Sequence, residues 1–369
     1  MTSGAPRDWS PIWSADGHIY FSSDRGGSMN LWRVPVDEAT GKATGEPEPL
    51  STPALFSGPL TISGDGKRIV YCARNPQSSL QRIAFDPAKE AIVGETVEFP
   101  LGNTFTAMPD ISPDGQWVVF NTLFEQEDIY VMRSDGRDLR KLTDDRYTDT
   151  WPRWSPDGKR IAFASNRPGV ISRTAGSGFQ IWAINADGSG LEQLTDLDPA
   201  AGGPPVWSPD GRRLAIRSER CKEPCFVDIS GTLPAKTAEV IPLPLTERGY
   251  QGPVLRWSPD GKWLLGIAWR RDKVTELRAF VYSVDTGTFR MSPEALRGPS
   301  AGARWLSDSR RIVMLDGNKL YVVDRDTLKG HEIHTFAFPA AELALSNDDR
   351  AIYFVRTSDE ADVWLAELQ

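Results

Sequence analysis

The chain has 369 residues, of which 40% are hydrophobic and 25% charged, and this composition excludes an intrinsically disordered protein. Its net charge is −8, whereas proteins that bind the phosphate backbone of nucleic acids carry an excess of basic residues. We therefore expect no nucleic-acid partner. No apolar run approaches the length of about 18 residues that spans a bilayer, and the N-terminal MTSGAPRDWSP has no signal pattern. We therefore expect no membrane insertion by this chain.

One short motif recurs along the whole chain. An aromatic or aliphatic residue is followed by Ser, a variable residue that is often Pro, and then Asp and Gly; the copies begin at Trp13, Ile62, Ile111, Trp154, Trp207, Trp257, Trp305 and Leu345. The last two copies are degenerate. Neighbouring copies lie 40 to 53 residues apart. Periods of about 40 to 50 residues are typical of β-propellers, in which each blade has four short strands.

The residues within one repeat predict those four strands in order. In the repeat that begins at Trp154, Ser-Pro-Asp-Gly suits a tight turn, because Pro presets φ, Asp caps its own backbone and Gly accepts positive φ. Short runs rich in aromatic and β-branched residues follow at 160–164 and 180–184. An Asp-Gly turn at 187–188 then leads into a last strand at 193–195.

These repeats predict an all-β fold, with a single β-propeller domain over residues 1–369. We predict eight blades of four antiparallel strands, with seven blades as the alternative if a degenerate repeat forms no blade. The chain ends on a third strand, so the last blade lacks an outer strand. Residues 2–8 are expected to pair there and close the ring, which would remove a free sheet edge.

The repeat resembles a known family. The pattern W-S-P-D-G-K-R-I-A-F from Trp154, continued by Ser165-Asn-Arg167 and later by Leu194-Thr195, is similar to the WD40-like (PD40-type) repeat of TolB-like propellers. The resemblance covers essentially the whole chain. Related propellers serve as the periplasmic TolB protein, as gating domains of prolyl-oligopeptidase-like peptidases and as sensor-like tails of bacterial kinases. The resemblance therefore implies a propeller in an extracytoplasmic bacterial setting, without choosing among these activities.

The motifs that carry enzymatic chemistry are missing from the sequence. Gly176-Ser177-Gly178 does not have the Gly-x-Ser-x-Gly spacing of a hydrolase nucleophile. The chain has only three His, and no glycine-rich phosphate loop leads from a strand into a helix. We therefore expect a protein that is not an enzyme and that uses no cofactor and no metal.

The three cysteines do not form a disulfide framework. Cys72 stands alone, whereas Cys221 and Cys225 are close enough in sequence to close a small loop. We expect two ordinary thiols at Cys221 and Cys225, and the loop bridge is the alternative.

The longer loops of the repeats all belong to one face of the predicted propeller. Loops that vary in length on a rigid scaffold are where binding residues usually lie. Arginines and aromatic residues in these loops suit a carboxylate-bearing ligand. The candidate ligand-binding residues are Arg25, Arg74, Tyr147, Asp149, Arg167, Arg173, Arg220, Tyr250 and Arg270. The alternative is that these arginines pair with Asp or carbonyl groups between blades.

The sequence therefore favours a non-catalytic binding or sensing module. It would recognise a protein, a peptide or a small polar ligand through the loop-rich face and the central funnel, as a monomer. One alternative is a hydrolase or lyase with its active site in the funnel. The other is an accessory propeller cut from a larger protein, such as a kinase or a prolyl-oligopeptidase-like peptidase.

Overall fold

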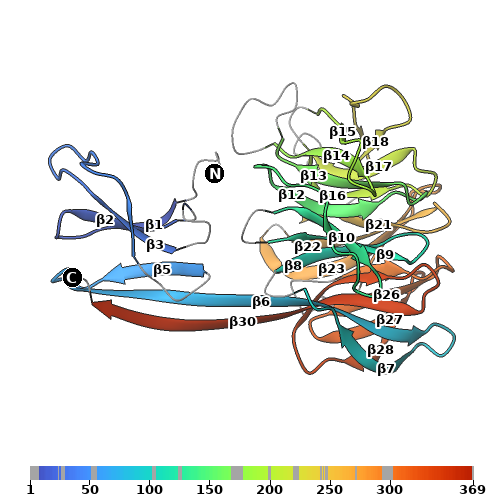
Figure 1. The fold of residues 1–369 in the computed structure, drawn as a ribbon. Helices are drawn as coiled ribbons and strands as arrows, with labels where there is room; N and C mark the ends of the chain where they lie inside the picture. The colour runs from blue at the N-terminus through green and yellow to red at the C-terminus, as the bar shows by residue number, and fades with distance from the viewer. Residues whose placement is uncertain are drawn as a thin grey trace. The chain divides into compact units, whose positions relative to one another are not determined.

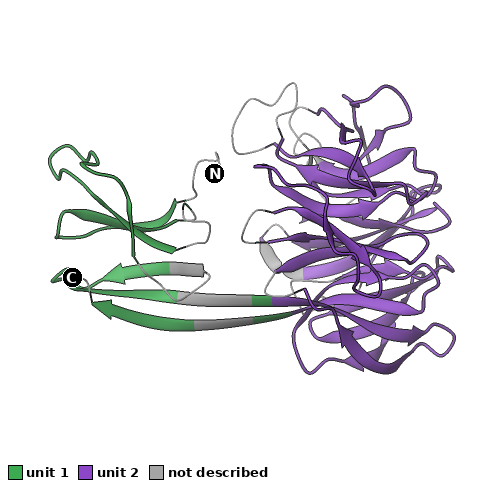
Figure 2. Ribbon diagram, in the orientation of Figure 1, with its two compact units in different colours: residues 1–77, 357–369 green, residues 78–356 purple. Residues whose placement is uncertain are grey.

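The computed structural model describes residues 8–23, 25, 30–50, 56–101, 105–123, 127–167, 178–197, 201–218, 224–241, 243, 245, 248–270, 272–292 and 302–367. The chain divides into two compact units, coloured separately in Figure 2: unit 1 comprises residues 1–77 and 357–369, and unit 2 comprises residues 78–356. The described residues form antiparallel sheets and contain no α-helix, so the all-β prediction is confirmed. No helix in this described part has the length and apolarity to cross a membrane.

Unit 1 holds the strands of the first repeat and the beginning of the second. Its four-stranded sheet has the order β1 (Asp8–Trp13), β2 (His18–Ser23), β3 (Asn30–Pro35) and β4 (Glu48–Pro49). Strand β5 (Phe56–Ile62) pairs with the first part of the long strand β6 (Arg68–Asp86). Figure 1 labels β1, β2, β3, β5 and β6.

Unit 2 contains five complete sheets of consecutive strands. The first two consist of β8 (Thr106–Ile111), β9 (Trp117–Thr122), β10 (Ile129–Arg133) and β11 (Arg140–Lys141), and of β12 (Asp149–Trp154), β13 (Arg160–Ser165), β14 (Gln180–Asn185) and β15 (Glu192–Gln193). The third consists of β16 (Ala201–Trp207), β17 (Arg213–Ser218), β18 (Pro224–Asp228) and β19 (Glu239–Val240). The last two consist of β20 (Tyr250–Gln251), β21 (Val254–Trp257), β22 (Trp263–Arg270), β23 (Lys273–Ser283) and β24 (Phe289–Met291), and of β25 (Ala303–Trp305), β26 (Arg311–Asp316), β27 (Lys319–Asp324) and β28 (Gly330–Thr335).

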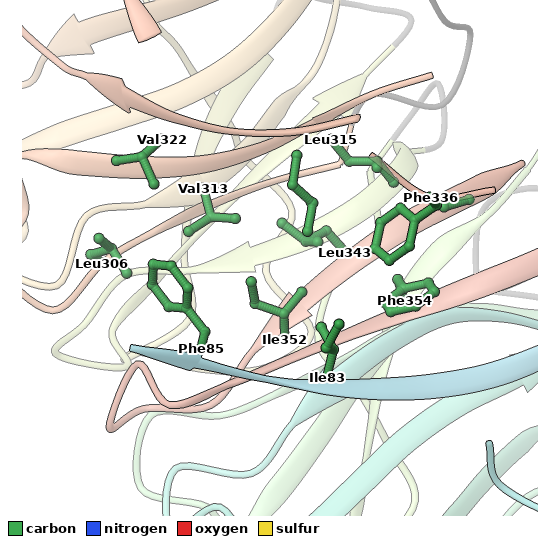
Figure 3. Packing of buried hydrophobic residues seen from close by; sticks show 12 residues of the cluster. Ile83, Phe85, Leu306, Val313, Leu315, Val322, Phe336, Leu343, Ile352 and Phe354 are labelled. Atoms are coloured by element: carbon green, nitrogen blue, oxygen red, sulfur yellow. The ribbon is translucent and has the colours of Figure 1, made fainter. Parts of the chain in front are cut away.

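A sixth sheet of unit 2 joins strands from the two ends of the sequence. Strand β29 (Ala340–Leu345) pairs with the first part of β30 (Ala351–Glu367), and the second part of β6 pairs with β7 (Ala91–Glu98). The two pairs are joined where the Phe85 amide donates to the Arg350 carbonyl at 2.8 Å. Figure 3 shows the buried side chains around this junction, where Phe85 of β6 and Ile352 of β30 belong to the same hydrophobic cluster.

The innermost strands of these six sheets contact one another in a closed ring. The order is β8, β12, β16, β21, β25 and β29, and β29 then contacts β8. The packing is tight: a Cβ placed on Gly302, just before β25, would lie 2.6 Å from the Leu343 Cβ of β29. Four-stranded antiparallel sheets around a closed ring are the arrangement of a β-propeller.

The predicted blade number of eight is not confirmed, nor is the alternative of seven. The closed ring in the described residues contains six sheets. The second repeat forms no separate blade in unit 2, because the second part of its strand β6, together with β7, completes the sheet of β29 and β30. Residues 1–7, which include most of the predicted closing segment, lie outside the described residues. Strand β30 pairs with β29 and β6, and the closure of the ring by residues 2–8 stays a prediction.

The Ser-x-Asp-Gly motifs form the turns that the sequence predicts. Ser155 donates its Oγ to Asp157 Oδ1 at 2.6 Å, and the same Asp157 oxygen accepts the Lys159 amide at 3.1 Å. Gly158 has a φ of 68°, in the left-handed region that Gly adopts without strain. These hydrogen bonds lower the pKa of Asp157, with the Ser155 hydroxyl as the main cause. The anchor aspartate here acts as a turn cap.

One cysteine expectation needs correction. Cys225 in β18 is buried and disulfide-bonded, whereas we expected an ordinary thiol at this position. Cys221 lies outside the described residues. Cys72 carries a free thiol.

Candidate functional site

Two cavities are lined by residues of the inner strands of the ring. The turn-side cavity, of about 460 Å³, lies where the inner strands end and is lined by the motif residues Pro113, Pro156, Pro209 and Pro259. The loop-side cavity, of about 560 Å³, lies where these strands begin. Three residues line both cavities: Arg153, Arg256 and Arg304. We call these three residues the arginine collar.

The repeat itself places the arginine collar. Arg153 of β12, Arg256 of β21 and Arg304 of β25 each stand one residue before the aromatic anchor of their repeat. Because successive strand residues point to opposite sides, equivalent positions in neighbouring blades point to the same part of a propeller. Asp110 occupies this position in β8, and its Oδ1 accepts a hydrogen bond from Arg256 Nη2 at 3.2 Å.

The guanidinium groups of the collar are held mainly by backbone carbonyls. Nη1 of each arginine donates to the carbonyl of the preceding residue, at 2.8 Å for Arg153, 2.8 Å for Arg256 and 2.9 Å for Arg304. Among the described residues, neither Arg153 nor Arg304 has a carboxylate within ion-pair distance, and the buried Nε of each has no hydrogen-bond partner. Arg153 is only 8% exposed. Donor groups are therefore left over at a buried position.

The electrostatics of the collar reflect this shortage of partners. Burial lowers the pKa of Arg153, and Asp110 and Glu342 oppose the shift. Burial, reinforced by the charges of Arg153 and Arg304, lowers the pKa of Arg256 well below its ordinary value. Burial and the charge of Arg153 lower the pKa of Arg304 to about 9. Burial therefore disfavours the charged form of each arginine, and the neighbouring carboxylates compensate for this only in part.

A β-bulge in the inner strands directs further side chains into the loop-side cavity. The register shifts within β8, β12 and β29, and Met108, Trp151 and Glu342 at these shifts have φ values of 55°, 56° and 52°. Bulges of this kind re-aim side chains next to functional sites. All three residues line the loop-side cavity.

The carboxylate of Glu342 interacts with two arginines of the collar. Its Oε2 accepts the Met108 amide, and it interacts electrostatically with Arg153 and Arg304. Burial raises the pKa of Glu342 to about 6, against the opposing influence of these donors. Together with Asp110, Glu342 places two negative charges beside the three positive charges of the collar. Among these five groups the positive charges exceed the negative ones by one, or by two when Glu342 is protonated, and Arg217 adds a further positive charge to the wall of the loop-side cavity.

Three of the residues predicted from sequence form a compact cluster of their own. Nη1 and Nη2 of Arg167 bind both oxygens of Asp149, and Nη2 also binds Asp145 at 2.6 Å. The ring of Tyr147 lies 5.5 Å from the Arg167 guanidinium. Asp149 is fully buried and Arg167 only 5% exposed. This pairing is an Arg–Asp contact of the kind that the alternative named, but it joins neighbouring strands of one sheet and not two blades.

The other predicted residues are spread over the chain. Arg25 belongs to unit 1 and binds Asp8 at 2.9 Å. Tyr250 and Arg270 are register partners in neighbouring strands, and Arg270 binds Asp272 at 2.8 Å. Arg173 and Arg220 lie outside the described residues, and Arg74 is described only through the backbone of β6. None of the described members of the set lines the two cavities.

The collar was missed at the sequence level although the sequence carries its signal. The dipeptide Arg-Trp occurs at the anchor of three repeats, at 153–154, 256–257 and 304–305. A charged residue repeated beside a core aromatic is unusual, because arginine is rarely buried without a partner. In the described residues, no group of three His, Cys, Asp or Glu side chains is placed to hold a metal ion.

Comparisons with known proteins place these features in context. The chain is 25% identical over 198 residues to the uncharacterized peptidase YuxL of Bacillus subtilis, which is 42% of this chain and 28% of that protein. A dipeptidyl-peptidase 5 of Porphyromonas endodontalis matches at 28% identity over 116 residues, with 16% of its length covered. The chain thus spans less than a third of these two relatives. Among solved structures, TolB from Acinetobacter baumannii is similar at 15% identity, with a TM-score of 0.49 over 97% of this chain and 81% of that one.

No family model matches the chain. A longer match exists to the uncharacterized protein Atu1656 of Agrobacterium fabrum. It is 31% identical over 208 residues, which cover 55% of this chain and 67% of that protein. On this similarity, the chain belongs to the same protein family as Atu1656.

Proposed function

We propose that this protein is a non-catalytic binding module whose propeller takes up an anionic ligand at the arginine collar. The observation that carries the proposal is the set of unpaired guanidinium donors at Arg153 and Arg304, which line both cavities. Charge-assisted hydrogen bonds from arginine to a carboxylate or phosphate are among the strongest polar contacts that proteins make. An anion at the collar would accept hydrogen bonds from the guanidinium groups and relieve the repulsion among the three arginines.

The overall charge of the protein sharpens this proposal. The chain has a net charge of −8, so the excess positive charge at the collar is a local feature of the ring interior. An anion would be drawn to this position and repelled by most of the remaining surface. The natural ligand would be a segment of a protein or peptide partner, or a small polar molecule, bound by a monomer.

Titration with simple anions tests the proposal. Each collar arginine precedes a tryptophan that lines the turn-side cavity, so intrinsic fluorescence reports on the site. We expect acetate and inorganic phosphate, at constant ionic strength balanced with chloride, to produce a saturable change. Arg304→Gln should weaken this binding by roughly tenfold, since one charge-assisted hydrogen bond contributes about 1.5 to 3 kcal/mol. The triple change of Arg153, Arg256 and Arg304 to Gln should abolish it.

Arg137→Gln is the matched control. Arg137 is 80% exposed and pairs with Asp135 in a surface turn, so its loss should leave anion binding unchanged. Absence of saturable binding in the unmodified protein, or equal binding by the triple variant, would refute the proposed function.

A second proposal rests on the two relatives that are named as peptidases. In this case the propeller would serve as the substrate-admitting part of a peptidase whose catalytic domain lies in polypeptide beyond this sequence. Reading the flanking coding sequence tests this proposal directly. A hydrolase domain in the same reading frame would support it, and a stop codon on one side with no such domain on the other would exclude it.

A further inference from the structure

The loop-side cavity has a character that the collar alone does not explain. Its wall contains Met108, Trp151, Leu255, Ile267, Trp269 and Leu343. All of these except Leu343 are half-buried, and the ring of Trp151 also contacts that of Phe179. A cavity of about 560 Å³ is within the usual range for small-molecule sites, which are mostly apolar with a few placed polar groups.

Most of the charged groups of this cavity belong to the arginine collar, and Arg217 and Glu342 line it as well. The arginine collar contributes three guanidinium groups, and Arg153 is nine-tenths buried with an unpartnered Nε. The apolar wall and the collar therefore border the same space. A ligand that fills this space has an anionic end and an apolar body.

We infer that the loop-side cavity binds a carboxylate that carries an apolar or aromatic group a few bonds away, with the carboxylate on the arginine collar and the apolar group between Trp151 and Trp269. This inference rests on the proposed function and names its ligand class. Two sources share this chemistry: the C-terminal residue of a peptide that ends in a large apolar side chain, and a free aromatic acid. Glu342 borders the same cavity, where one of its oxygens accepts the Met108 amide. It could also accept the backbone N–H of a peptide C-terminal residue.

Matched small molecules separate the two parts of the ligand. The probe is 3-phenylpropionate, compared with acetate, which lacks the apolar body, and with 3-phenylpropanol, which lacks the charge. We expect calorimetric titration to give an affinity for 3-phenylpropionate at least tenfold higher than for either comparison compound. If acetate and 3-phenylpropionate bind equally, the inference is wrong and the proposed anion site stands. If neither anion binds, or if the alcohol binds as well as the acid, the proposed function itself is wrong.

A pair of tryptophan variants on one strand locates the apolar contact. Trp269→Ala should weaken 3-phenylpropionate at least fivefold and leave acetate unchanged, since only the apolar body touches this side chain. Trp263→Ala is the control, because Trp263 is on the same strand β22 but contacts Arg325 at 4.3 Å and does not line the cavity. Equal loss in both variants, or loss of acetate binding with Trp269→Ala, would contradict the inference.

The two sources are distinguished with a tripeptide that ends in Phe. The form with a free C-terminal carboxylate is compared with the C-terminal amide. Tighter binding of the free form than of 3-phenylpropionate would assign the site to peptide C-termini. Weaker binding of the free peptide would assign it to small aromatic acids.

Discussion

Arg167 on one side, and Arg153 with the half-buried Arg304 on the other, have opposite surroundings in this propeller. Arg167, at the end of β13, is bound by Asp149, Asp145 and the Ser165 hydroxyl at 2.7 Å. Arg153, on the neighbouring strand β12, and Arg304, on β25, donate to backbone carbonyls and lack a carboxylate partner among the described residues. Burial acts against the charge of all of them, and only Arg167 receives enough partners for its pKa to be raised.

The contrast separates structural arginines from ligand-binding ones. A buried charge whose hydrogen bonds are satisfied within the protein stabilises one arrangement of the chain and has little left to offer a ligand. A buried charge with unsatisfied donors destabilises the folded state, and a ligand that pairs with these donors offsets the destabilisation. The loop arginines that stood out in the sequence include the first kind, whereas the inner-strand arginines are of the second kind.

The largest expected effect comes from removing the satisfied arginine. Arg167→Met would leave the fully buried Asp149 without its cationic partner, and breaking a buried ion pair in this way costs about 3 to 5 kcal/mol. Urea unfolding measures the loss, which should be greater at pH 8 than at pH 5, because a protonated Asp149 tolerates burial better. A second change, Asp149→Asn, should recover part of it. A loss below 1 kcal/mol would remove the basis for calling Arg167 structural.

The same substitution at the collar should have the opposite sign. Arg304→Met removes a charge that burial and Arg153 destabilise, while the aliphatic side chain still fills the space, so we expect the free energy of unfolding to rise by about 1 kcal/mol. Anion binding should weaken in the same variant. A clear loss of stability would show that Arg304 is a structural residue like Arg167, and the distinction between the two arginines would be wrong.

The smallest expected effect is a pH dependence of anion binding. Glu342, whose pKa is raised to about 6, is ionised above this pH and then opposes an anion near Arg153 and Arg304; Asp110 adds a second negative charge. Affinity for acetate should rise severalfold as the pH falls from 8 to 5.5, a range in which acetate stays mostly ionised. Glu342→Gln should bind as tightly at pH 8 as the unmodified protein does at pH 5.5. An unchanged pH profile in this variant would assign the titration to another group.

The sequence by itself determined the local structure of this protein. Turn chemistry acts over a few residues, so Ser155, Asp157 and Gly158 form the turn that their order predicts. The alternation of apolar residues in short runs likewise predicts strands such as β13 and β14, and the spacing of the anchors predicts blades arranged in sequence. These features depend on neighbours along the chain, which the sequence shows directly.

Only the tertiary structure decided how the blades close and where the binding groups meet. The pairing of β6 with β30 brings together residues 265 positions apart, Phe85 and Arg350, and no local pattern encodes this choice of partner. The arginine collar likewise depends on three strands that are far apart in sequence. The residue at the equivalent position of each strand faces the same space. Whether a buried arginine is satisfied, as Arg167 is, or left with free donors, as Arg304 is, depends on which carboxylates the fold brings near it. That proximity is a property of the closed ring, and a single repeat does not reveal it.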